Sequence, residues 1–245
     1  MLHKADTLGK CKLIAVDREI GKIRDLYFDD RFWTVRYLVA DTGGWLTGRL
    51  VLISPFSVNL VDAEEEMIGT TLTAKQIEES PSPEADKPVS RQFESVYADY
   101  YGYPYYWYGP GAWGAYPRPS LMHPKEMVEQ EESWDSHLRS ADEVQDYEVG
   151  ALDHHIGHIS DFIVDDESWT IRYLVVDTRN WWPGKHVLLS PGWATAVDWA
   201  TRTVAVDLTR DAIKQAPEYD EDKPITRDYE IELFRHYSKQ DYWSA

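Results

Sequence analysis

The sequence is poor in cysteine, in positive charge and in long apolar runs. Cys11 is the one cysteine among 245 residues, so no internal disulfide can form and a reducing compartment fits. No run of about 18 apolar residues occurs, which predicts no transmembrane helix. The N-terminus has no run of about 7–15 apolar residues after a basic start, so no signal peptide is predicted. These absences favour a cytoplasmic protein without membrane insertion.

The balance of charge is strongly negative, with 25 Lys and Arg residues against 43 Asp and Glu and a formal net charge of −18. Phosphate backbones repel such a chain, so nucleic acid is not an expected partner. The residues between Leu121 and Gly150 include nine acids against Lys125 and Arg139, which favours a solvated stretch. Hydrophobic residues still make up 43% of the chain, enough to build buried cores.

An internal repeat organises the chain. The segment GKIRDLYFDDRFWTVRYLVADTGGWLTGRLVLISPF starts at Gly21 and aligns without a gap with GHISDFIVDDESWTIRYLVVDTRNWWPGKHVLLSPG, which starts at Gly157, 136 positions later. Chance does not hold such a register, so we expect a tandem duplication with copies at residues 8–101 and 144–237. Residues 102–143 are then a linker, aromatic with Gly and Pro at first and acidic later, with no counterpart after the second copy.

Each copy is expected to be mainly β. Short apolar and β-branched runs alternate with turn residues every 8–12 positions, which is typical of a small barrel or sandwich. In the first copy the expected strands are Lys22–Asp29, Trp33–Ala40, Leu50–Ile53, Phe56–Val61 and Met67–Leu72. A short helix is expected at Thr73–Glu79 with Thr73 as its N-cap, matched by Thr209–Gln215.

A second helix is expected after the Lys-Pro pair of each copy, with Ser90 or Thr226 as the N-cap. In each helix, mostly aromatic residues recur at helical spacing and form a stripe along one face. The stripes are Phe93, Val96, Tyr97, Tyr100 and Tyr101 in the first copy, and Tyr229, Leu233 and Tyr237 in the second. Two interpretations stay open: the stripe packs on its own barrel, or it docks on the other copy or a partner.

The repeated pattern resembles the PRC-barrel domain. It reads Ile-Gly-x-Ile-x-Asp, then Asp-Asp, Trp-x-x-Arg-Tyr-Leu-Val-x-Asp-Thr, a Trp-containing loop and Leu-x-Ser-Pro, over residues 13–85 and 149–221. That domain is shared by the photosynthetic reaction-centre H subunit and the C-terminal part of the 16S rRNA processing factor. The resemblance implies two small β-barrels of about six strands each, and an assembly or interaction role without enzymatic activity.

Few residues suggest chemistry. His154, His155 and His158 have spacings that can supply metal ligands, but they lie at a loop-to-strand junction where exposed histidines are ordinary. Asp29 and Asp30, like Asp165 and Asp166, are expected to form a turn and not an acid–base pair. No metal site and no cofactor are therefore predicted.

Arg36 and Arg172 each interrupt an apolar strand, and a buried charge needs a partner. We expect salt bridges from Arg36 to Asp25 or Asp41, and from Arg172 to Asp161 or Asp177.

The first functional hypothesis is a non-enzymatic protein-interaction or assembly module, with the two barrels paired inside one chain. A homodimer is left open. The alternative is an accessory factor of membrane electron transfer or reaction-centre assembly, by analogy with the H subunit, and an enzyme of unknown class comes third. The aromatic linker tract has three open roles: packing across the barrels, flexibility, or anchoring a partner. The expected partner-binding residues are Trp45, Trp181, Trp182, Trp193, Tyr105, Tyr106, Trp107 and Trp113.

Overall fold

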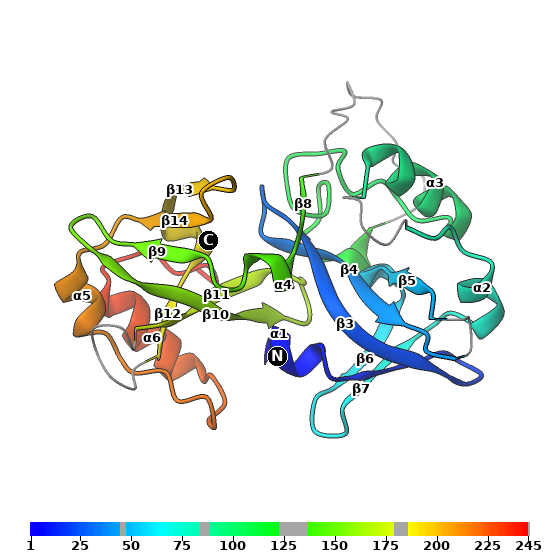
Figure 1. Ribbon diagram of the computed structural model, residues 1–245, viewed down its shortest axis with the longest axis horizontal. Coiled ribbons are helices and arrows are strands. Elements are labelled where there is room, and N and C mark those ends of the chain that lie inside the picture. The colour runs from blue at the N-terminus through cyan, green and yellow to red at the C-terminus, as the bar shows by residue number, and fades with distance from the viewer. Residues whose placement is uncertain (45–47, 84–88, 123–136, 179–185, 245) are drawn as a thin grey trace. The chain divides into compact units, whose positions relative to one another are not determined.

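The computed structural model of the protein describes residues 1–44, 48–83, 89–122, 137–178 and 186–244. It is mainly β with short helices, as the sequence predicts (Figure 1), and its strands form two seven-stranded sheets where about six strands each were expected. The chain divides into two compact units. The first unit holds Met1, His3–Asp142 and Val164–Ile171, and the second holds Leu2, Glu143–Ile163 and Arg172–Ala245. Closure of either sheet into a barrel stays a prediction.

The elements occur in two matching series, offset by 136 positions apart from single-residue differences at their ends. The first series is β1 (Leu2–Lys4), α1 (Ala5–Leu8), β2 (Lys12–Ile14), β3 (Glu19–Asp29), β4 (Thr34–Asp41), β5 (Leu50–Ile53), β6 (Val58–Asp62), β7 (Met67–Thr70), α2 (Ala74–Glu78) and α3 (Arg91–Tyr101). The second series is β8 (Leu138–Ser140), α4 (Ala141–Val144), β9 (Glu148–Gly150), β10 (His155–Asp165), β11 (Ile171–Asp177), β12 (His186–Leu189), β13 (Ala194–Asp198), β14 (Thr203–Val206), α5 (Arg210–Lys214) and α6 (Arg227–His236).

The repeat starts earlier than expected from the sequence. The structure places β8 and α4 at Leu138–Val144, almost wholly within the end of the segment assigned to the linker, and they match β1 and α1. The strand β8 has three residues and forms by pairing with the longer β3, and no local pattern marks it. The connecting stretch therefore ends before Leu138.

The two sheets share one strand order. The first runs β5-β4-β3-β2-β7-β6 with β8 paired to β3, and the second runs β12-β11-β10-β9-β14-β13 with β1 paired to β10. Within each path one pair is parallel, β2 with β7 and β9 with β14. In the first unit a buried cluster joins the sheet to α3 and β8; it consists of Tyr37, Val39, Leu52, Val89, Tyr97 and Leu138.

The strand predictions hold closely, with one instructive shift. The strand Leu50–Ile53 is reproduced as expected. The next strand begins at Val58 and not at Phe56, because Pro55–Ser57 form a 3₁₀ turn that Ser54 caps through the Phe56 N–H. Every residue of β4 before Asp41 is buried, so both faces of this strand are covered.

The helices begin where the capping signals indicate. Thr73 and Gln76 form a capping box at α2, and Ser90 and Thr226 accept N–H groups at the starts of α3 and α6. Figure 1 shows α2 and α3 together at one side of the first unit's strands. The α3 stripe packs on its own sheet, since the Tyr97 hydroxyl donates to the Leu52 carbonyl at 2.9 Å. Val96 and Tyr100 are exposed instead, at 58% and 40%.

Candidate functional site

Arg36 is buried in β4, as expected, but its ion-pair partner differs from the prediction. Its Nε lies 2.5 Å from Asp29 Oδ2, and neither Asp25 nor Asp41 is its partner. The other oxygen of Asp29 accepts the backbone N–H groups of Arg31 and Phe32. Asp29 therefore shapes the turn after β3 and neutralises Arg36 at the same time.

The two carboxylates expected to pair with Arg36 have other partners. Asp25 accepts the Ser140 hydroxyl at 2.6 Å and the Asp142 N–H at 3.2 Å, so it holds β8 and α4. Burial raises the pKa of Asp25 to about 6. Asp41 pairs with the exposed Arg24 at 3.0 Å, and the Gly43 N–H and Arg24 lower the pKa of Asp41.

The centre of the first unit's site is a carboxylate without solvent exposure, Glu94 in α3. Its Oε1 accepts the hydroxyls of Tyr37 at 3.1 Å and Tyr106 at 2.6 Å. Its Oε2 lies 2.6 Å from Arg91 Nη1. Burial is the largest influence and raises the pKa of Glu94 to about 7, while Arg91 and the two hydroxyls oppose that rise.

Aromatic rings cover the two arginines of this site. The Arg36 guanidinium lies 3.7 Å from the centre of the Tyr106 ring and 4.5 Å from that of Trp113. Arg91 lies 4.5 Å from the Trp107 ring. Ring faces attract cations, and this attraction strengthens where water is excluded. We call Arg36, Tyr37, Arg91, Glu94, Tyr106 and Trp107 the first cluster.

The second unit contains the same arrangement at the same offset. Glu230 Oε1 accepts the hydroxyls of Tyr173 and Tyr242, both at 2.7 Å, and its Oε2 lies 2.9 Å from Arg227. The guanidinium of Arg172 lies 4.0 Å from the Tyr242 ring.

Arg227 lies 4.1 Å from the Trp243 ring. We call Arg172, Tyr173, Arg227, Glu230, Tyr242 and Trp243 the second cluster. Asp161 accepts the Phe162 N–H and Asp177 lies near His186, so a pairing of either with Arg172 stays a prediction.

These contacts correct one interpretation of the aromatic tract. The tract has no counterpart in the alignment of the two copies, yet Tyr106 and Trp107 recur as Tyr242 and Trp243 and occupy matching positions. The pair was missed because two residues after a divergent connection give no visible alignment. The glutamates Glu94 and Glu230 were missed as well, because a charged residue in an amphipathic helix is normally assigned to solvent.

The residues expected to bind a partner differ in their exposure. Tyr106, Trp113 and Trp193 are buried, at 7%, 0% and 7% exposure, so they serve packing and offer no surface to a partner. Tyr105 and Trp107 are half-buried and stack on each other. Trp45, Trp181 and Trp182 lie outside the described residues.

The histidine segment has ordinary surface geometry. His154 and His155 are exposed and His158 is half-buried. His154 lies 3.5 Å from Asp153, and His155 lies 3.9 Å from Glu148. Within the described ranges, no group of three or more His, Cys, Asp or Glu side chains is placed to hold a metal ion. In the same ranges no helix has the length and apolar character needed to cross a membrane.

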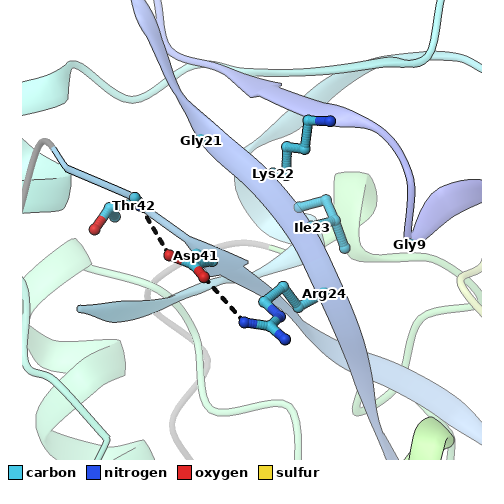
Figure 2. Close-up of a pocket in the computed structure, with 8 residues that line it drawn as sticks. Gly9, Gly21, Lys22, Ile23, Arg24, Asp41 and Thr42 are labelled. Atoms are coloured by element: carbon cyan, nitrogen blue, oxygen red, sulfur yellow. Dashed lines mark hydrogen bonds and ion pairs between the residues drawn. The ribbon is translucent and has the colours of Figure 1, made fainter. Parts of the chain in front are cut away.

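A surface hollow of about 480 Å³ lies over β3 and β4, lined by Gly9, Gly21, Lys22, Ile23, Arg24, Asp41, Thr42 and Gly43. Figure 2 shows the Arg24 side chain directed at Asp41, while Lys22 extends away from that pair. The two cations do not converge, and one of them is already paired. The hollow therefore lacks the concentrated charge that a small anion needs.

Comparison with known proteins supports the resemblance for the first part of the chain. The model of the PRC-barrel domain matches residues 3–77, which span β1 to α2. No curated protein matches the chain significantly.

Proposed function

We propose that the protein is a non-enzymatic interaction or assembly module built from two PRC-barrels. The match to residues 3–77 supports the first barrel, and the repeated order of strands and helices supports the second. The observation that carries the proposal is the duplicated cluster. In both units a buried glutamate accepts hydrogen bonds from two tyrosine hydroxyls and forms an ion pair with an arginine.

A buried carboxylate with these contacts has a structural role. Glu94 has both oxygens occupied and no exposure, so it does not reach a substrate. A buried carboxylate that serves as a general acid or base needs access to the proton it transfers. The first cluster instead connects α3 to the sheet, because Glu94 lies on α3 and its hydrogen-bond partner Tyr37 lies on β4. Two sheets, each with a helix fixed to it by buried polar contacts, suit protein binding.

The test is reconstitution with a defined partner. The full chain, tagged and expressed at its natural level, is captured from native extract, and each stoichiometric partner is purified separately. We expect a complex of fixed composition by size-exclusion chromatography with light scattering, at micromolar concentrations or below. Recovery of only reaction-centre or respiratory complexes would favour the electron-transfer alternative. Turnover of a metabolite by the purified chain, with no partner bound, would contradict the proposal.

A further inference from the structure

The first unit's sheet ends at β6, which pairs with β7 along one side. In the part of the chain that the structure describes, no strand pairs with the other edge of β6. Asn59 and Leu60 are exposed there, and Leu60 is 50% exposed. Figure 1 shows the turn between β6 and β7 at the lower margin of the first unit. Lysine or proline often protects such an edge from pairing with another chain, and β6 contains neither.

The exposed Leu60 lacks cover from its cross-strand neighbour. It lies opposite Gly69 of β7 in the ladder. A side-chain carbon at Gly69 would lie 2.9 Å from Asn59 Oδ1 and 3.1 Å from Leu60 Cβ, so the two strands leave little room for a larger residue. Cross-strand pairs are the contacts that stabilise apolar side chains on a sheet. The other cross-strand position beside Leu60 lies on the open edge of β6, where an added strand can fill it.

Free acids follow this edge at the end of β6. Residues 62–66 include four acids and no base. The Asp62 carboxylate accepts the Glu65 N–H at 3.0 Å and closes the turn. Glu64, Glu65 and Glu66 are exposed, and their carboxylates form no ion pair with another described residue. Such a concentration of negative charge attracts basic groups and repels acidic ones.

The second unit has the same edge without these two features. Its sheet ends at β13 as the first ends at β6. Ala196 and Ala205 pair there, at the positions of Leu60 and Gly69, so no large apolar side chain is left without cover. The matching turn, residues 198–202, has one acid and one base. The features that select a partner therefore belong to β6.

We propose that β6 pairs with an extended segment of a partner protein that has apolar residues at alternate positions and a basic N-terminal end. The inference rests on the proposed interaction function and names the chemistry of the partner. Antiparallel pairing is the commoner kind, and it places the N-terminal end of the added segment beside residues 62–66, because β6 runs toward them. Main-chain hydrogen bonds supply affinity, while Leu60 and the acids select the segment. A second copy of β6 lacks the basic end and brings its own acids.

The test uses a fluorescein-labelled peptide, KKKTVTVTV, added to the full chain. We expect saturable binding by fluorescence anisotropy at micromolar concentrations, and weaker binding as the salt concentration rises. The control peptide KKKTPTPTP keeps the three lysines, but its prolines cannot donate to a strand ladder. It should show no saturable binding, which separates strand pairing from attraction between charges.

The first variant removes the apolar contact. Leu60→Ser should weaken binding of KKKTVTVTV about fivefold, as expected when half a leucine side chain is no longer covered. Leu152→Ser is the matched control, because Leu152 is a leucine of the second unit that is 65% exposed and lies outside the edge. Both leucines are at the surface, so we expect both variants to fold.

The second variant removes the acids beside the edge. Glu64→Gln, Glu65→Gln and Glu66→Gln together should weaken binding about tenfold, as expected for the loss of three exposed ion pairs. The matched control changes the same amount of charge in the second unit. It carries substitutions of three exposed acids, Glu218→Gln, Asp222→Asn and Glu232→Gln.

Three results would overturn the inference: absence of binding, equal binding of the proline peptide, or binding that either the Leu60 variant or the glutamate variant leaves unchanged. A dimer of the protein that Leu60→Ser dissociates, measured by light scattering, would identify a second copy as the occupant and would also overturn it. If a purified natural partner binds both variants as tightly as the native chain, the proposed function stands and this edge alone is rejected.

Discussion

Arg36 and Asp29 form a buried ion pair, and removal of either partner leaves an uncompensated charge in the core. Their side chains are 1% and 5% exposed. We expect Arg36→Ala to lower the free energy of unfolding by about 3–5 kcal/mol, measured by urea titration.

The control for this prediction is Arg24→Ala on the neighbouring strand. Arg24 pairs with Asp41 at the surface and its side chain is 65% exposed, so its loss should cost less than about 1 kcal/mol. Equal effects of the two variants would contradict the buried pair.

Glu94 makes the stability of the protein depend on pH. Its pKa is raised to about 7 from the ordinary value of 4.5, so between these values the folded state holds a proton that the unfolded state has lost. Stability contributed by this group is therefore present below pH 4.5 and falls as the pH rises toward 7.

Comparison with Glu94→Gln isolates that contribution. The stability of the native protein relative to this variant should fall by about 3 kcal/mol between pH 4.5 and 7.5, measured by urea titration at several pH values. A difference that stays constant with pH would show that Glu94 is ionised throughout this range. Asp25, with a pKa raised to about 6, is unchanged in both proteins and cancels.

Among the residues, the sequence predicts the burial of Arg36 but not its partner. Alternation along a strand says which face a residue takes, while the choice among Asp25, Asp29 and Asp41 depends on how β3 and β4 pair. Two register shifts in that ladder, between Ile23 and Asp25 and between Tyr27 and Phe28, break the simple alternation.

At the scale of the elements, the pairing of β3 with β4 requires a glycine at one position of β3, and the pairing of β10 with β11 requires one at the matching position of β10. A side-chain carbon at Gly21 would lie 2.0 Å from the Asp41 carbonyl oxygen, and at Gly157 the same distance from that of Asp177. These contacts are backbone, so no flexible side chain can move aside.

We therefore expect Gly21→Ala to lower the free energy of unfolding by more than about 2 kcal/mol, measured by urea titration. The matched variant Gly150→Ala, in β9, meets nothing within 4 Å and should change it by less than about 0.5 kcal/mol. A neutral Gly21→Ala would mean that β3 and β4 lie further apart than described.

The elements themselves were largely predictable where the signal was local. Caps at Thr73, Ser90 and Thr226 and the apolar run of β5 depend on neighbours in sequence. The segment β8 was not predictable, because three residues become a strand only through pairing with β3 at Tyr27–Asp29.

For the whole molecule, the excess of acids should make stability depend on salt. The excess of carboxylates, which gives a net charge of −18, causes repulsion between side chains in the compact state, and added ions screen that repulsion. We expect the melting temperature, measured by differential scanning fluorimetry, to rise by several degrees between about 20 mM and 300 mM NaCl at pH 7.5. A melting temperature that stays constant or falls would show that attractive ion pairs outweigh the repulsion.

The sequence alone determined the internal repeat of its strand pattern, the mainly β class and the positions of most strands and caps. These follow from period-two alternation, turn residues and an alignment of the chain with itself at an offset of 136 residues, all of which can be recognised in the sequence. Only the tertiary structure decided that Glu94 is buried, that Tyr106 and Tyr242 occupy equivalent sites, and that Trp113 packs inside. Those choices depend on which side chains meet across elements distant in sequence, where burial and pairing outweigh local preference.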